Sequence, residues 1–174
     1  VAYIKNTKTP FSIDFGVGDV IVPKQEKRKI PTQLDDFTAP TVNTYSLETT
    51  IAEKIDAILS LMEFSSRMKD YYDIYYLANK FDFDGATLTE ALRKTFENRR
   101  HAFTVEQFEQ VMAFDGDEAM QKKWKAFYRK IDTKTDDYGT VLKTISDFLA
   151  KPFSAAISSN NFSAKWHTDV CLWK

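Results

Sequence analysis

The segment 66–77 contains charged residues within a stretch that is otherwise mostly apolar or aromatic. At about 100° per residue, Lys69, Asp70 and Asp73 fall in one sector of a helix, and Arg67 lies at its first turn. Because an isolated buried charge is very costly, charges on a mostly buried helix must be paired, hydrated or functional. Two interpretations stay open: the group acts on a ligand, or it consists of internal pairs, Lys69 with Asp73 and Arg67 with Asp70.

Lys54 is a second candidate, at the edge of an apolar stripe in the segment 46–64. The stripe has five members: Ile51, Ile55, Ile58, Leu59 and Met62. This position predicts a stem packed on the core and an ammonium that reaches a neighbouring cleft; a lysine that only covers the core boundary is the alternative. A short turn near residue 65 must make the two helices antiparallel, so we predict that Lys54 and Asp70 lie across one cleft.

Helical periodicity from Ser46 onward positions these side chains. We expect helices at about 46–64, 66–80, 87–100, 104–113, 116–131 and 138–150. The expected N-caps are Ser46, Ser66, Thr87 and Thr104, the last with Gln107 in a capping box. Asp82-Phe83-Asp84 follows one helix and precedes the next, and we interpret it as a turn and N-cap. In the tail, Trp166, Leu172 and Trp173 are expected to dock on the body.

The N-terminal part is predicted to be β. We expect strands at 1–5, 11–15 and 20–22, with the glycines of Gly16-Val17-Gly18-Asp19 in a hairpin turn. Asp14 would be displayed at the turn end of its strand. Residues 24–44 are predicted to be an extended connector. The expected fold class is α+β, with strands and connector over 1–44 and a mainly helical bundle over 45–174.

Composition limits the other possibilities. With 24 basic and 25 acidic residues, the chain has no global field that attracts nucleic acid, so such contacts must come from local patches. Cys171 is the single cysteine, which excludes an intrachain disulfide and a cysteine-based zinc site. His101 and His167 have no partners at metal-ligand spacing. Since no apolar run approaches the roughly 20 residues of a membrane span, we expect a cytoplasmic protein with no membrane partner.

Several segments together resemble a known family. Ala52-Glu53-Lys54 and the pattern Arg67-x-Lys69-Asp70-x-x-Asp73 are similar to the third and fourth motifs of the AbiEii/AbiGii nucleotidyltransferase toxins. Residues 12–19 resemble the hairpin of that family, and residues 81–85 resemble the segment after its fourth motif. The resemblance covers roughly residues 11–100 in matching order and spacing.

The resemblance implies metal-assisted transfer of a nucleoside monophosphate from a nucleoside triphosphate to an acceptor such as tRNA. Lys54 would contact the triphosphate, and Asp70 and Asp73 would orient Lys54 or the attacking hydroxyl. Arg67 and Lys69 would bind phosphate or hold those two carboxylates in place. Mg²⁺ would be the metal, with Asp14 as a candidate ligand; a residue that only anchors the hairpin is the alternative for Asp14. A cognate antitoxin of a type IV system would be the protein partner, and abortive infection against phage would be the biological setting.

The sequence also departs from the family pattern. A Gly-Ser turn and an Asp-x-Asp strand, which would hold most of the metal ligands, are expected to precede Val1. We therefore predict that these residues are the C-terminal portion of the enzyme and are inactive alone. A catalytically inactive helical binding or interaction module is the alternative.

Two basic clusters could contact nucleic acid. One cluster contains Lys122, Lys123, Lys125, Arg129 and Lys130, and the other contains Arg93, Lys94, Arg99, Arg100 and His101. Solvated helix faces are the alternative for both.

Overall fold

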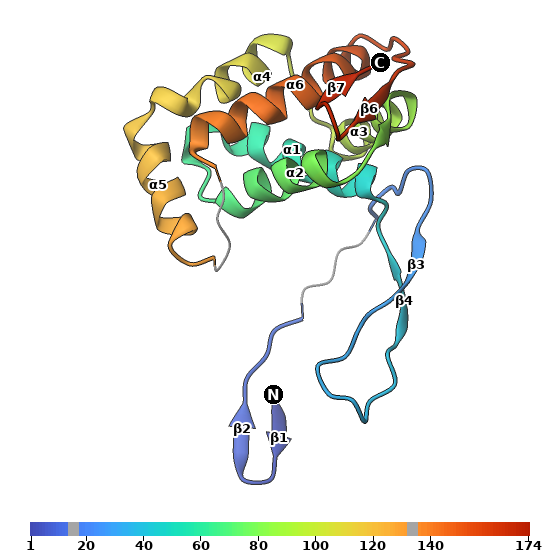
Figure 1. Ribbon diagram of the computed structural model, residues 1–174, viewed down its shortest axis with the longest axis vertical. Coiled ribbons are helices and arrows are strands. Elements are labelled where there is room, and N and C mark those ends of the chain that lie inside the picture. Colours follow the sequence, from blue (N-terminus) through green and yellow to red (C-terminus); the bar gives the residue numbers. More distant parts are fainter. Residues whose placement is uncertain (14–17, 132–135) are drawn as a thin grey trace.

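Six α-helices form the body of the protein (Figure 1). The computed structural model describes residues 1–13, 18–131 and 136–174, and the helix count refers to these. The helices are α1 (Leu47–Leu61), α2 (Met68–Lys80), α3 (Gly85–Arg99), α4 (Val105–Met112), α5 (Glu118–Tyr128) and α6 (Tyr138–Ile157). Short 3₁₀ turns, η1 (Met62–Phe64) and η2 (Phe114–Gly116), follow α1 and α4. With the small antiparallel sheets, this architecture confirms the α+β class.

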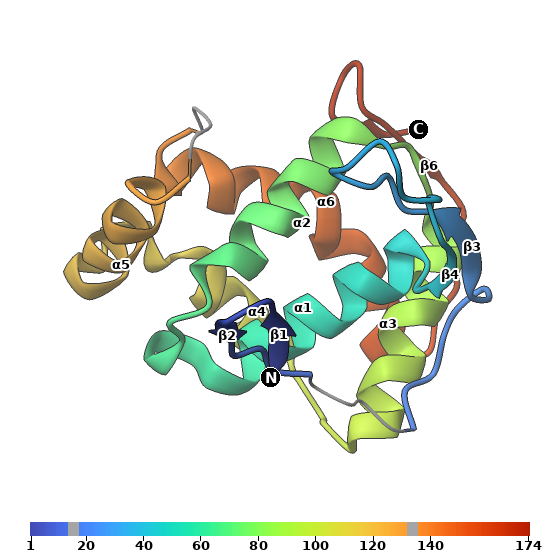
Figure 2. The same ribbon diagram turned by 90° about the horizontal axis from the view of Figure 1, so that it is seen from below.

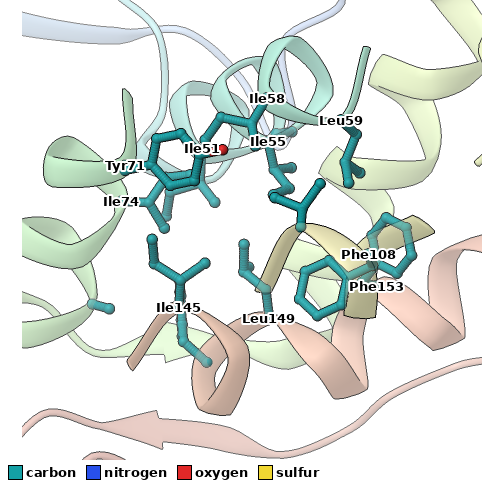
Figure 3. Packing of buried hydrophobic residues seen from close by; sticks show 14 of the residues in the cluster. Ile51, Ile55, Ile58, Leu59, Tyr71, Ile74, Phe108, Ile145, Leu149 and Phe153 are labelled. Carbon is teal, nitrogen blue, oxygen red and sulfur yellow. The ribbon is translucent and has the colours of Figure 1, made fainter. Parts of the chain in front are cut away.

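Helix α6 packs against α2, α3 and α4, and the apolar stripe of α1 faces α6 across the core (Figure 3). Figure 3 shows Ile55 and Ile74 turned towards Ile145 and Leu149, and all four are fully buried. Burial of such a side chain stabilises the fold by about 1.5–3 kcal/mol. Figure 2 shows α1 between α2 and α3, which both contact it. The core therefore fixes which face of α1 remains open to the outside.

The C-terminal tail forms a small sheet with the segment between α2 and α3. Strands β5 (Phe83–Asp84), β6 (Lys165–His167) and β7 (Leu172–Trp173) are antiparallel, in the order β5-β6-β7. Trp166 is fully buried, and its Nε1–H donates to the carbonyl of Ala78 at 2.7 Å. The predicted docking is confirmed for both tryptophans, but it is wrong for Leu172, which is 55% exposed because alternate residues of a strand face opposite sides.

Helix α6 continues through Pro152 to Ile157, beyond the predicted end at 150. A proline inside a helix has no N–H for the carbonyl four residues earlier, here that of Phe148. The Nε1–H of Trp173 donates to this carbonyl at 2.9 Å. Trp173, from the tail, thus supplies the hydrogen bond that Pro152 cannot. The helix can therefore continue beyond the end that the sequence around Pro152 indicates.

Two hairpins precede α1 and lie outside the helical body (Figure 1). Strands β1 (Ala2–Ile4) and β2 (Thr7–Thr9) form the first, and β3 (Glu26–Lys29) and β4 (Thr41–Thr44) form the second. The predicted strands at 11–15 and 20–22 are wrong over 11–13 and 20–22, and residues 14–17 lie outside the described part. The predicted connector instead contains the β3–β4 hairpin. Its strands are mostly exposed and therefore lack the apolar alternation that identifies a half-buried strand.

The helix starts are only partly as expected. Ser46 caps α1, and Thr104 with Gln107 forms the capping box of α4. Ser66 and Thr87 are not caps: α2 begins after Arg67 without a side-chain cap, and Asp84 caps α3 by accepting from the N–H of Thr87 at 2.8 Å. The interpretation of Asp82-Phe83-Asp84 as a turn and cap is therefore confirmed at Asp84.

Candidate active site

Lys54 lies on the side of α1 that faces α2. Its Nζ donates to Asp70 Oδ1 at 2.8 Å and lies 2.6 Å from Asp73 Oδ2. The turn between the helices reverses the chain, so the middle of α1 comes beside the first two turns of α2. The structure brings Lys54 and Asp70 together, as the spacing of the two helices predicts.

Arg67, just before α2, and Lys69, in its first turn, add further contacts to these carboxylates. Arg67 Nε donates to Asp70 Oδ2 at 2.5 Å, and Lys69 Nζ donates to Asp73 Oδ2 at 2.6 Å. The internal pairs considered from the sequence therefore exist beside the interhelical contacts of Lys54. Asp70 is only 5% exposed, and each of the two carboxylates contacts two cations. Removal of any one cation leaves each carboxylate with a partner.

Lys54 is held as an ammonium ion. Its partial burial by itself lowers the pKa, but hydrogen bonds to Asp70 and Asp73 and their charges outweigh the burial, so the pKa is raised above its ordinary value. Lys54 therefore remains positively charged at neutral pH and can serve as a compact cation beside an anionic group.

A cleft of about 230 Å³ opens next to Lys54. Its lining residues are Tyr45, Thr50, Glu53, Lys54, Ala57, Arg67, Asp70 and Arg99. Asp73 is not among them, although it contacts Lys54. Among the described residues, the cleft is therefore lined by three cations, on α1, just before α2 and at the end of α3, and by two carboxylates, of which Asp70 is nearly buried.

A second charged group lies on the opposite flank of α1, against α3. Arg99 pairs with Glu53 and lies 3.8 Å from Asp56 and 3.8 Å from Asp19. Asp56 is 2% exposed, and its Oδ1 lies 2.8 Å from His101 Nδ1. Tyr45 OH donates to Asp19. Sequence reasoning assigned no role to Glu53, although it lies in a quoted motif, and it placed Arg99 only in a basic cluster.

Comparison with known proteins identifies the family. A family model described as nucleotidyl transferase AbiEii toxin, type IV TA system, matches residues 2–157. The chain belongs to this family. No curated protein and no solved structure matches it. The AbiEii family is a family of nucleotidyltransferase toxins, and the match spans both helices that carry the charged groups.

Other residues singled out in this AbiEii chain have structural partners. Asp82 accepts from the N–H of Thr168 at 2.9 Å, so Asp82 and Asp84 each bind backbone N–H groups. Lys123 Nζ donates to the carbonyls of Glu63 at 2.8 Å and Ser65 at 2.9 Å, which fixes the turn between α1 and α2. Asp14 lies outside the described residues.

Asp70 and Asp73, beside Lys54, are the carboxylates in this site that would have to bind a divalent cation. Asp70 and Asp73 are each engaged by two cations. Within residues 1–13, 18–131 and 136–174, no group of three histidine, cysteine or acidic residues is close enough to hold a metal ion. Asp70 and Asp73, as they are paired, therefore do not fit a Mg²⁺ site. In the same residues, no helix is long and apolar enough to cross a membrane.

Proposed function

We propose that the cleft beside α1 binds the phosphates of a nucleoside triphosphate in a nucleotidyl transfer reaction. The observation that carries this proposal is Lys54, whose ammonium lies between Asp70 and Asp73 at the edge of a cleft that Arg67 also lines. A cation fixed by two carboxylates cannot swing away, and a fixed charge costs no reorganisation when phosphate charge develops. Membership of the AbiEii family supports the reaction class.

In the proposed reaction, an acceptor hydroxyl oxygen attacks the α-phosphorus. A bond forms between them, the bond from that phosphorus to the oxygen bridging the β-phosphorus breaks, and pyrophosphate leaves. The hydroxyl proton passes to solvent. Phosphoryl transfer depends almost entirely on positioning and electrostatic stabilisation, which are the properties that a constrained ion network supplies.

Each charged residue has a proposed role. Lys54 and Arg67 line the cleft and bind phosphate oxygens there, with Arg67 offering the donors that its bond to Asp70 leaves over. Lys69 does not line the cleft and pairs with Asp73, so its proposed phosphate contact lies outside the cleft. Asp70 and Asp73 hold Lys54 in place, and Asp70 also lines the cleft, where it can orient the attacking hydroxyl. The two aspartates therefore act chiefly through the cations that they position.

Nucleotidyltransferases generally use a divalent metal. We derive no step through it, because Asp70 and Asp73 are already engaged by cations and the described residues contain no group of three metal-binding side chains. We propose that Mg²⁺ is bound by carboxylates outside the described residues, with Asp14 still a candidate, and that residues 1–174 alone do not transfer nucleotides. Labelled triphosphates, Mg²⁺ and bulk tRNA test the second statement. Robust incorporation by residues 1–174 would contradict it.

We propose tRNA or another nucleic acid as the acceptor and a cognate antitoxin as the protein partner, both in the cytoplasm. Lys122, Lys125, Arg129 and Lys130 are exposed on and just after α5, which supports a phosphate-binding surface there. Crosslinking of the full-length protein to tRNA, compared with a variant in which these four residues are glutamine, tests the acceptor. Equal crosslinking by both would contradict this surface.

A catalytically inactive interaction module is the competing function. The complete mutual pairing of Lys54, Arg67 and Lys69 with Asp70 and Asp73 favours it, because a purely structural ion network has the same contacts. Nucleotide incorporation by the full-length protein separates the two. An active wild type and an inactive Lys54→Met variant support the transferase, whereas an inactive wild type with Mg²⁺ and every triphosphate supports the module.

A further inference from the structure

The cleft has a floor on α1 and two flanks with opposing arginines. Thr50, Glu53, Lys54 and Ala57 form one stripe of α1, since residues three and four apart share a helix face. Arg67 lines the cleft from the α2 side and Arg99 from the end of α3. Figure 2 shows α2 and α3 on opposite sides of α1.

Both arginines are anchored at one edge of the guanidinium group. Arg67 donates through Nε to Asp70, and Arg99 donates through Nη2 to Glu53. Their side chains are nevertheless 55% and 42% exposed, respectively. Within the described residues, Arg99 donates no other hydrogen bond that the structure records, although a guanidinium has five N–H donors. Arg67 is therefore oriented by one carboxylate, and Arg99 by Glu53 with Asp19 and Asp56 each 3.8 Å away. Both guanidinium groups have donors left over for a ligand in the cleft.

We propose that Arg99 binds a phosphate group of the same triphosphate, on the opposite side of Lys54 from Arg67. This inference rests on the proposed function and adds a residue to that site. A single phosphate can satisfy one guanidinium, whereas a polyphosphate chain has oxygens along its length for cations on the floor and both flanks. The cleft of about 230 Å³ is smaller than the roughly 300–1,000 Å³ of pockets that enclose whole drug-sized ligands. It therefore suits the phosphate chain, with the nucleoside outside.

The test measures binding of inorganic tripolyphosphate to the full-length protein by titration calorimetry. Arg99→Gln is expected to weaken binding by about tenfold or more, because a hydrogen bond to a charged group is lost. Arg99→Lys should restore part of the affinity, since it keeps the charge but loses the planar fork. Arg100→Gln is the matched control: the neighbouring arginine does not line the cleft, and we expect wild-type affinity.

Two further variants separate phosphate contact from a structural role. Glu53→Gln removes the same ion pair and keeps the guanidinium, so we expect a loss of only about twofold. An equal loss in Glu53→Gln and Arg99→Gln would overturn the inference. Lys54→Met tests the proposed function itself. If Lys54→Met loses binding while Arg99→Gln keeps wild-type affinity, only the inference fails; if the wild type does not bind, or Lys54→Met binds normally, the proposed phosphate site fails as well.

Discussion

Two charged groups flank the same helix, and they differ in how their carboxylates are paired with cations. On the α2 flank, Asp70 and Asp73 share three cations, so each keeps a partner when one cation is removed. On the α3 flank, Asp56 has His101 at 2.8 Å, while Arg99 lies 3.8 Å away. Redundant pairing suits a site that a ligand enters and leaves, whereas a single close partner suits a contact that joins helices. The comparison predicts that the α2 flank is more important for activity and the α3 flank, at Asp56, for stability.

The largest effect on stability is expected at His101. His101→Ala leaves the buried Asp56 with only the distant Arg99, and an unsatisfied buried polar group costs about 1–3 kcal/mol. Thermal melts should show a transition several degrees lower. Ser60→Ala is the control, because Ser60 is an exposed neighbour 3.3 Å from the same ring nitrogen. A melt of His101→Ala within a degree of the wild type would contradict the assigned role of this pair.

A smaller difference between the flanks should appear with salt. Arg99 is 42% exposed in its pair with Glu53, so Arg99→Gln should cost at most about 1 kcal/mol of unfolding free energy. This cost should shrink in 1 M NaCl, where the screening length falls to about 3 Å. The cost of Lys54→Met should change less, because the Lys54 side chain is only 19% exposed and is therefore less screened by salt. Urea titrations at low and high salt measure the unfolding free energy lost in each variant. Equal salt sensitivity of the two losses would contradict the difference between the flanks.

The smallest expected effect is the pH dependence of the Lys54 contacts. The folded-state pKa of Lys54 is raised above its ordinary value of 10.5, so its contribution is fully present below about 10.5 and is lost as pH rises through the folded pKa. The stability difference between wild type and Lys54→Met should therefore be constant from pH 7 to 9 and decrease above 10.5. A difference that already disappears by pH 9 would show that the ammonium is not stabilised.

The same two flanks show what the sequence can predict. The contact between Lys54 and Asp70 follows from helical periodicity and a short turn. Two antiparallel helices joined by such a turn have few ways to pair their facing residues. The α3 flank was not predicted, since Asp56 and His101 are 45 residues apart and meet only because α3 packs on α1. The β3–β4 hairpin lacks a local apolar signal, and the continuation of α6 past Pro152 depends on Trp173 from the tail. Long-range packing, rather than local propensity, decides these features.

The most direct measurement compares growth inhibition with thermal melting for Lys54→Met and Asp70→Asn in the full-length protein. Both variants should lose growth inhibition and melt close to the wild type, since each remaining carboxylate keeps a cation and Lys54 keeps Asp73. Lys143→Met is the control, because this exposed lysine on α6 pairs only with Asp147 among the described residues. If each ion were instead essential to the structure, removal of one partner would lower the free energy of unfolding by about 3–5 kcal/mol. Variants that remain toxic, or that melt many degrees earlier, would contradict a catalytic site at Lys54 and Asp70.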